Sequence, residues 1–295
     1  MCNPFHFQSS YPQNQKIFLN KPIFKNMLST KTLRYLLTSV FGLALFIAGC
    51  STSPESGMGT LEVRLVDAPI DNAKEVNVAI NSVQVNNSET DTGWVTISEP
   101  GETFNLLNLT NGAYAVLGEA ELEAGTYEQI RLILDSDGNS IVFENGDTES
   151  LFVPSGAQSG LKLNVNAEIE PGFTYTLILD FNASKSVVKA GNSGKYLLKP
   201  VIRATNMATT GKIAGTVLPA EARSQVHAIV GEDTLTTTFA DTTDGTFELI
   251  GLEGGSYTVG FEPREEGFAG KDTTNIEVSV GETNDIGTVE LDTQN

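Results

Sequence analysis

The stretch Thr60-Leu61-Glu62-Val63-Arg64-Leu65 (TLEVRL) alternates apolar and charged side chains. Successive side chains of a β-strand point to opposite faces, so this period of two predicts a strand with one buried and one exposed face. Similar runs recur along the chain, separated by turns rich in Gly, Asn and Asp. The further strands predicted in this half are 76–80, 83–85, 94–97, 127–134, 141–143, 161–165, 175–181 and 196–202.

No stretch after residue 57 shows a long run of apolar residues at the helical spacing of three to four. The single candidate is 113–122, and Gly118 inside it limits the segment to a short helix at most, because glycine weakens a helix interior. We therefore predict an all-β fold.

A polar break at 207–210 is followed by seven shorter strand-like runs. Short strands at regular spacing are typical of a β-sandwich. The sequence thus predicts two β-sandwich domains in tandem, with boundaries at 58–207 and 208–295. The predicted strands of the second domain are 212–217, 225–230, 234–239, 246–250, 256–261, 275–280 and 286–291.

The N-terminal part has the order of a secretory signal: basic Lys31 and Arg34, an apolar run at 40–48, small residues and then a polar tail. The run is shorter than the roughly 20 residues that span a membrane. We expect translation to begin at Met27 and residues 1–49 to be an extension plus signal peptide. Residues 50–57 form a Ser-, Pro- and Gly-containing tether.

The segment Ile47-Ala48-Gly49-Cys50 resembles the lipobox of bacterial lipoproteins. The resemblance implies that Cys50 becomes the lipidated first residue and anchors the chain in a membrane of the bacterial cell envelope. Ser51 is not the aspartate associated with retention in the inner membrane, so the resemblance favours the outer membrane, on its periplasmic or its surface side.

The charge balance is strongly acidic. Five of the 18 basic residues and none of the 37 acidic ones precede Cys50, so residues 50–295 carry a net charge of −24. Such a surface makes nucleic acid an unfavourable partner. Cys2 and Cys50 are the two cysteines, so a lipidated mature chain has no pair for a disulfide and must be stabilised by its hydrophobic cores.

The second half resembles the carboxypeptidase-regulatory-like domains, which have a transthyretin-like sandwich of about seven strands. The resemblance is carried by 211–217 (GKIAGTV), by 244–259 (DGTFELIGLEGGSYTV) and by 280–287 (VGETNDIG). Asp244-Gly245 is a hairpin turn signal, and Phe247 and Leu249 alternate inward after it. Sandwiches of this type often bind sugars, which implies a carbohydrate-binding or accessory role by analogy of fold.

The first half is similar to a bacterial envelope domain, the domain of unknown function 4382. The matching residues include Asp67-Ala68-Pro69, Gly93-Trp94-Val95, 124–132 (AGTYEQIRL), Leu179-Asp180-Phe181 and 196–203 (YLLKPVIR). The family has no known activity, so the resemblance implies only the fold and a location in the bacterial cell envelope.

No catalytic motif is visible. His227 is the one histidine after Cys50 and lies in an alternating run, and the sequence has no Gly-x-Ser-x-Gly elbow, so we predict that the protein is not an enzyme. Zinc is disfavoured by the same shortage of ligands.

Calcium is the one cofactor with a candidate site. Asp135, Asp137 and Asn139 place oxygen-bearing side chains at alternate positions, as a hard cation requires. The segment departs from an EF-hand loop, because Ser140 stands where the loop has glycine. A hairpin turn between strands at 130–134 and 140–143 explains the same residues through their turn preference, and we favour it over calcium binding.

Ligand contact by aromatic rings is expected at Trp94 and Phe268, and Phe268, in a Gly-flanked loop, is predicted to be the most exposed ring. The function expected from the sequence is a lipid-anchored, non-catalytic binding module for a glycan or another envelope protein. Two alternatives remain, a purely structural or adhesive surface protein and a hydrolase accessory.

Overall fold

The computed structural model describes residues 57–87, 93–154 and 159–294, which are nearly all β. Cys50 and the rest of the predicted signal and tether up to Ser56 lie outside the described residues. No helix in the described part is long and apolar enough to cross a membrane.

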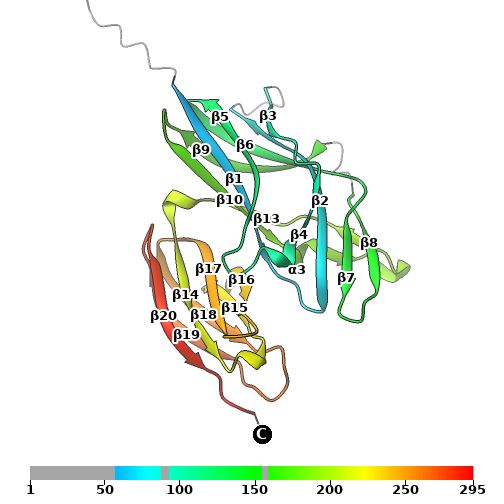
Figure 1. Cartoon of the computed structure of the whole chain (residues 1–295), viewed down its shortest axis with the longest axis vertical. Coiled ribbons are helices and arrows are strands. Elements are labelled where there is room, and N and C mark those ends of the chain that lie inside the picture. The colour runs from blue at the N-terminus through cyan, green and yellow to red at the C-terminus, as the bar shows by residue number, and fades with distance from the viewer. Residues whose placement is uncertain (1–56, 88–92, 155–158, 295) are drawn as a thin grey trace, which may run out of the picture. The chain divides into compact units, whose positions relative to one another are not determined.

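Two sheets contain the strands of residues 58–206 (Figure 1). The four-stranded sheet has the order β13-β10-β1-β5 and the nine-stranded sheet the order β11-β12-β8-β7-β2-β6-β9, with β3 and β4 also paired to β2. The strands are β1 (Met58–Ala68), β2 (Ala73–Asn86), β3 (Val95–Ser98), β4 (Glu102–Asn105), β5 (Ala115–Glu123), β6 (Gly125–Leu134), β7 (Ser140–Phe143), β8 (Thr148–Phe152), β9 (Leu161–Ile169), β10 (Thr174–Asn182), β11 (Val187–Lys189), β12 (Tyr196–Leu198) and β13 (Ile202–Asn206). One short helix, α3 (Ala183–Ser186), follows β10.

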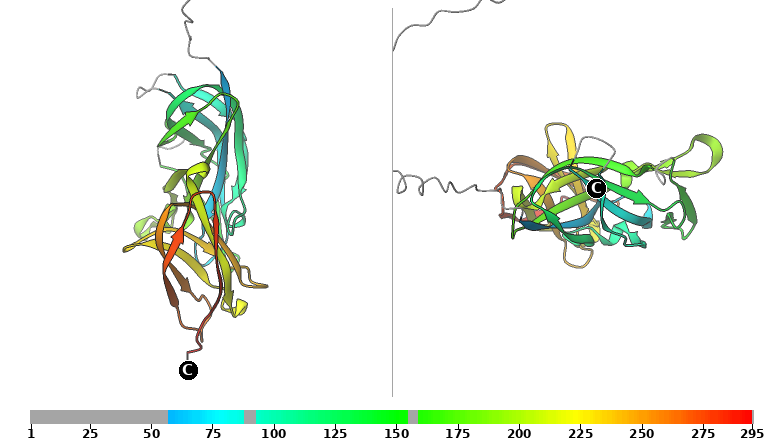
Figure 2. Two further views of the ribbon diagram at one scale, coloured as in Figure 1. Left: turned by 90° about the vertical axis from the view of Figure 1, so that its left-hand side faces the viewer. Right: turned by 90° about the horizontal axis from the view of Figure 1, so that it is seen from above.

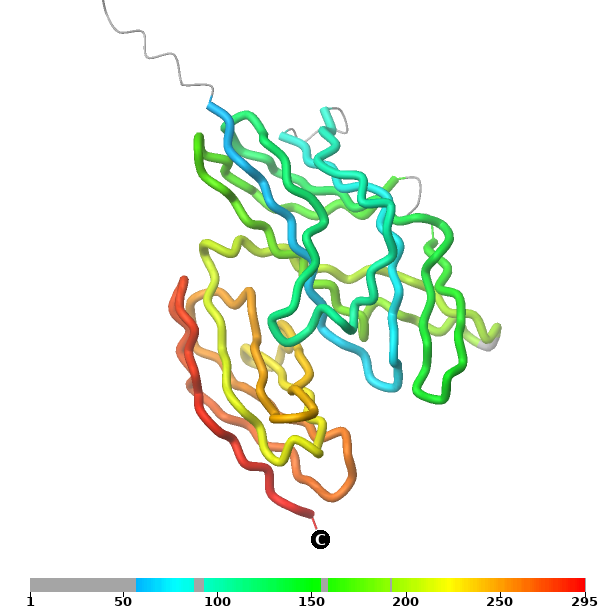
Figure 3. Tube along the Cα trace, in the orientation of Figure 1, coloured from blue at the N-terminus to red at the C-terminus, as the bar shows by residue number. Residues whose placement is uncertain are grey.

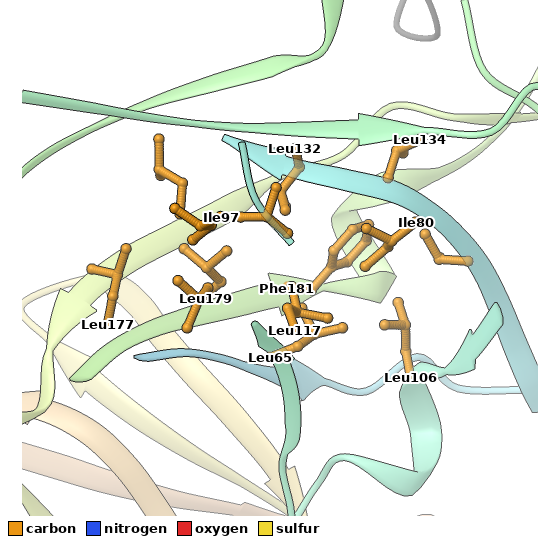
Figure 4. Packing of buried hydrophobic residues seen from close by; sticks show 14 of the residues in the cluster. Leu65, Ile80, Ile97, Leu106, Leu117, Leu132, Leu134, Leu177, Leu179 and Phe181 are labelled. Carbon is orange, nitrogen blue, oxygen red and sulfur yellow. The ribbon is translucent and has the colours of Figure 1, made fainter. Parts of the chain in front are cut away.

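Alternating side chains of β1 and β10 build the core between these sheets. Leu61, Val63 and Leu65 are fully buried, as the opening stretch predicts, and Leu179 and Phe181 of β10 join them. Figure 4 shows side chains from β1, β2, β5, β6 and β10 pointing toward one another. Burial of this many apolar groups is the main stabilising contribution to the first sandwich.

The second pair of sheets contains the seven strands predicted for residues 208–295, so the all-β fold with tandem sandwiches is confirmed. Their orders are β17-β14-β20 and β16-β15-β18-β19. The colours of Figures 2 and 3 follow the chain from the first pair, in blue and green, to the second, in yellow and red. The strands are β14 (Thr210–Leu218), β15 (Gln225–Val230), β16 (Asp233–Phe239), β17 (Thr246–Glu253), β18 (Gly255–Glu262), β19 (Lys271–Val278) and β20 (Thr283–Glu290).

Each sandwich has one tyrosine corner where the chain crosses between its sheets. Tyr127 follows the β5–β6 crossing and its hydroxyl donates to the carbonyl of Glu123 over 3.2 Å. Tyr257 follows the β17–β18 crossing and donates to the carbonyl of Glu253 over 2.8 Å. The two five-residue segments, EAGTY and EGGSY, therefore perform the same structural task, because each ties the corner to the strand that precedes it.

Three details differ from the sequence expectation. Residues 113–122 contain strand β5 and no helix, because β5 pairs with β1 along its length. Residues 76–80 and 83–85 belong to one strand, β2, whose register shifts between Ile80 and Ser82 and breaks the alternation there. Asp244-Gly245 does not close a hairpin, since β16 and β17 lie in different sheets.

The strands of the first pair of sheets end at Asn206 and those of the second begin at Thr210. Residues 55–295 nevertheless form one compact unit, so the domain boundary at 207/208 stays a prediction. The connection is short. The two sandwiches also contact each other through side chains, for example where Arg264 pairs with Asp71 at 2.8 Å.

Candidate functional site

The predicted calcium residues lie at the β6–β7 turn, and Asn139 has a structural task there. Its side chain is 4% exposed. Its Oδ1 accepts the N–H of Ala79 over 2.9 Å, and its Nδ2 donates to the carbonyl of Asp135 over 2.8 Å. The amide oxygen that calcium would need thus already satisfies a buried backbone donor.

The two aspartates of this turn are more open. Asp135 Oδ1 accepts from Asn81 Nδ2 over 3.1 Å, and Asp137 is exposed. Among the described residues, no group of three His, Cys, Asp or Glu side chains could hold a metal ion. The predicted hairpin is wrong, because β6 and β7 both pair with β2 and not with each other. Residues 135–139 connect these two strands, the contacts of Asn139 give it a structural role in the connection, and calcium binding by Asp135, Asp137 and Asn139 stays a prediction.

The two predicted aromatic contacts lie apart in the fold. Trp94, before β3, is half-buried, with the Arg131 guanidinium carbon 4.2 Å from its ring centroid. Phe268 is half-buried and packs against the second core. The prediction that Phe268 is the most exposed ring is wrong, because Tyr114, at 46% exposure, is more open. Ligand contact by Trp94 and Phe268 stays a prediction.

His227, on β15, is engaged within the second sandwich. Its Nδ1 lies 2.9 Å from Thr237 Oγ1, and its Nε2 lies 3.5 Å from a carboxylate oxygen of Glu262. Burial lowers the pKa of His227, although the Glu262 carboxylate opposes this. Burial therefore favours the neutral form of the imidazole.

A cleft lies where the outer face of the four-stranded sheet meets the second sandwich. Core residues of β1 and β10 have odd numbers, so even-numbered side chains of these strands point away from the core. Val66 and Ile178 are such residues, yet they are 5% and 4% exposed because the second sandwich covers them. Together with Ile250 of β17 they form an apolar floor.

The rim of the cleft is aromatic and charged. Tyr114 and Met207 line it, and the Arg64 guanidinium carbon lies 4.3 Å from the Tyr114 ring centroid. Arg64 also pairs with Glu62 at 3.0 Å. Lys212 also lines the cleft and pairs with Glu248 at 2.6 Å. The cleft has a volume of about 130 Å³, enough for a small ligand or part of a larger one.

A largely buried ion pair lies on the same outer face of the four-stranded sheet as Ile178. Asp180 of β10 and Arg203 of β13 are opposite each other in the antiparallel ladder, and their side chains pair at 2.9 Å. Arg203 Nη1 also donates to the carbonyl of Gly251 in β17 over 2.8 Å. Burial raises the pKa of Asp180 above its ordinary value, although Arg203 opposes the shift.

Asp67, at the end of β1, is the second buried carboxyl. Its Oδ1 accepts the N–H of Ala183 over 3.1 Å. Burial raises its pKa well above the ordinary value, and the nearby Asp180 adds to the shift. Sequence reasoning missed this residue, although a signal exists: Asp67 continues the inward positions of Leu61, Val63 and Leu65. An acidic residue at a core-facing position of an alternating strand indicates a buried carboxyl group.

No curated protein matches the chain. Several solved structures match this chain, but their TM-scores are low, so the chains superpose poorly over their whole length. The Bacillus anthracis TIE protein is 15% identical with a TM-score of 0.24, and the match covers 80% of this chain and 34% of that one. GBS52, the minor pilin of Streptococcus agalactiae, is 10% identical with a TM-score of 0.22 and coverages of 79% and 96%. The shaft pilin SpaA of Lactobacillus rhamnosus GG is 10% identical, with a TM-score of 0.22 and coverages of 80% and 98%.

The chain thus spans about a third of the TIE protein, and TM-scores this low carry no argument about function. The match to a family model is more specific. Residues 58–200 match the model described as "Domain of unknown function (DUF4382)", in agreement with the resemblance seen in the sequence. The match covers β1 to β12 and thus most of the first sandwich. Residues 58–200 of this chain therefore contain a DUF4382 domain.

Proposed function

We propose that the protein is a non-catalytic binding module of the bacterial envelope, anchored by lipid on Cys50. It binds a carbohydrate or another envelope component. The address rests on the order of charges, apolar run, lipobox-like segment and polar tail in residues 31–57. The outer membrane is the proposed location, because Ser51 follows the lipidated cysteine.

The observation that carries the binding role is the cleft beside Tyr114. Sugar rings present apolar C–H faces together with hydroxyl groups, so aromatic rings next to paired polar groups suit them. Tyr114 combines an exposed ring with the neighbouring Arg64, and Lys212, which pairs with Glu248, also lines the cleft. Tyr114 replaces Trp94 and Phe268 as the first ring to test, since it alone of the three lines this cleft.

A structural or adhesive role is the second candidate, and the contacts between the sandwiches favour it. Asn111 donates its N–H to Thr238 Oγ1 over 2.7 Å, and Arg264 pairs with Asp71 at 2.8 Å. Together with the Arg203 bond to Gly251, these contacts join the two sandwiches at several points. These contacts restrict the movement of one sandwich relative to the other, which suits a structural spacer in the cell envelope.

The binding role is tested by thermal unfolding of the full chain with a panel of envelope polysaccharides. A specific glycan at 100 times its dissociation constant stabilises the folded state by about 2.7 kcal/mol, which raises the Tm measurably. We expect Tyr114→Ala to weaken binding by up to about tenfold. The matched control is Phe173→Ala, which removes a 68% exposed ring outside the cleft.

If every polysaccharide leaves the Tm unchanged, the structural role takes precedence. Binding that survives Tyr114→Ala but is lost in Trp94→Ala or Phe268→Ala returns the site to the rings chosen from sequence. The anchor is tested separately by labelling cells with radioactive palmitate. We expect the label in the natural chain and none in Cys50→Ser, and an unlabelled natural chain contradicts the anchor.

A further inference from the structure

A second, much smaller cavity lies beside the cleft, between the end of β1 and strand β16. It is lined by the turn at 109–112, by Asp67, by Thr236 and Thr238, and by Glu248. Its volume of about 10 Å³ is close to that of one water-sized sphere. Gly112 adopts φ of +79°, and a Cβ there would lie 3.1 Å from the Glu248 side chain, so glycine permits this close approach.

One carboxylate oxygen in this cavity lacks a hydrogen-bond partner. Asp67 is 4% exposed, and its Oδ1 is satisfied by the N–H of Ala183. Its Oδ2 is fully buried and has no partner among the described residues. A buried carboxylate oxygen without a partner destabilises the folded state. A cation or a hydrogen-bond donor in the adjacent cavity would remove this loss.

The local charge balance distinguishes a cation from a neutral occupant. Asp67 and Asp180 are both buried, and Arg203 pairs with Asp180 alone. Glu248, at the cavity wall, is already balanced by Lys212. The other cation that acts on Asp180 is Lys185, which is exposed at the surface. When Asp67 is ionised, the buried groups therefore carry a formal charge of −1, which a neutral water does not compensate.

The polar side chains that line the cavity carry mainly oxygen atoms, and four apolar residues, Val66, Leu109, Leu249 and Ile250, complete its wall. Asp67 N–H donates to the Leu109 carbonyl, Ala113 N–H to the Thr110 carbonyl, and Asn111 N–H to Thr238 Oγ1. These three backbone donors are therefore engaged, and the groups that remain are the Asp67 carboxylate oxygen and threonine hydroxyls, which can donate a hydrogen or offer an oxygen lone pair. Small hard cations select such oxygen ligands.

From these observations we propose that the cavity binds one small hard cation of the size of Na⁺ or Ca²⁺, with Asp67 Oδ2 as its charged ligand and threonine hydroxyl oxygens around it. Because β1 and the 109–112 turn belong to the first sandwich and β16 to the second, a bound cation also joins the two sandwiches. This site is distinct from the predicted calcium residues Asp135, Asp137 and Asn139.

The test is thermal unfolding of the full chain in choline chloride, with equimolar NaCl, KCl or, at matched ionic strength, CaCl₂ or MgCl₂ in its place. A cation at 100 times its dissociation constant is expected to raise the Tm by about 5 to 10 °C. The NaCl and CaCl₂ arms decide which of the two ions binds. Titration calorimetry on the natural chain, with a stoichiometry of one expected, keeps the proposal testable if a variant does not fold.

Asp67→Asn keeps the shape and removes the charge, so it is expected to abolish the cation-dependent shift. Asp137→Asn is the matched control, because it removes an exposed carboxylate from the β6–β7 turn and is expected to retain the shift. A shift that survives Asp67→Asn overturns the proposal, and one lost in Asp137→Asn moves the site to the turn. Stabilisation by acid alone, with no effect of any cation, shows that a proton satisfies Asp67 and also overturns the proposal.

Discussion

Two clusters of Asp and Asn side chains in the first sandwich have similar composition and opposite surroundings. At the β6–β7 turn, the oxygen of Asn139 accepts the N–H of Ala79, Asp137 is exposed, and Asp135 is half-buried and bonded to Asn81. Where the end of β1 lies beside β10, Asp67 and Asp180 are buried, and each keeps one carboxylate oxygen without a hydrogen-bond partner among the described residues. The difference teaches that ligand potential depends on which oxygens the fold leaves unsatisfied, more than on the spacing of acidic residues in the sequence.

The largest expected effect comes from breaking the buried pair. Asp180→Ala leaves the Arg203 guanidinium without its carboxylate at a largely covered position. Removing one partner of such a pair costs about 3 to 5 kcal/mol, and we expect the lower end because Arg203 retains 27% side-chain exposure and its bond to Gly251.

Urea unfolding followed by circular dichroism measures this loss. Asp135→Ala, at the exposed turn, is the matched control and should change the unfolding free energy by less than about 0.5 kcal/mol. Equal losses in the two variants contradict the contrast between the clusters.

A smaller loss is expected for Asn139→Ala, which tests whether the turn cluster is structural. The substitution leaves the buried N–H of Ala79 without its acceptor, and this costs about 1 to 3 kcal/mol. Asn145→Ala, in the next turn, is the control, since the Asn145 side chain is exposed. A loss no greater than that of the control, again by urea unfolding, argues that Asn139 is available for a ligand.

The smallest effect is a difference in pH dependence between the natural chain and Asp67→Asn. Burial raises the folded-state pKa of Asp67, so between the unfolded pKa and the raised one the folded chain holds more protons. The contribution of Asp67 is therefore favourable at acidic pH and is lost as pH rises through the folded-state pKa.

Unfolding free energies measured in choline chloride from pH 4.5 to 7.5 check this sign. We expect Asp67→Asn to gain stability relative to the natural chain as pH rises. His227 acts in the opposite direction, because burial lowers its pKa and stability falls as pH drops through its unfolded value. That term is common to both proteins and cancels, so a pH-independent difference contradicts a buried, titrating Asp67.

Regular alternation was enough to predict much of the fold. The seven strands of the second half follow from short alternating runs and glycine-containing turns, and the first strand follows from TLEVRL. Errors arose where a neighbour overrides the local pattern. Strand β5 is held by its pairing with β1, and the register shift near Ser82 hides the continuity of β2.

The sites were less predictable. Trp94 and Phe268 were chosen by residue type, but exposure depends on distant packing, and Phe268 is covered by the second core. Tyr114 stands out only because the second sandwich forms the other wall of its cleft. Likewise, nothing near residue 67 in the sequence states that a strand from residues 233–239 closes over it.

The sequence by itself determined the all-β class, the inward faces of the strands and the acidic character, because these depend on local period and composition. It also carries the lipobox-like segment on which the proposed address rests. Only the tertiary structure decided that Val66 and Ile178 lie under a second sandwich and that Asp67 is buried with an unpartnered oxygen. Such facts depend on contacts between residues far apart in the sequence, and no local pattern encodes which surfaces meet.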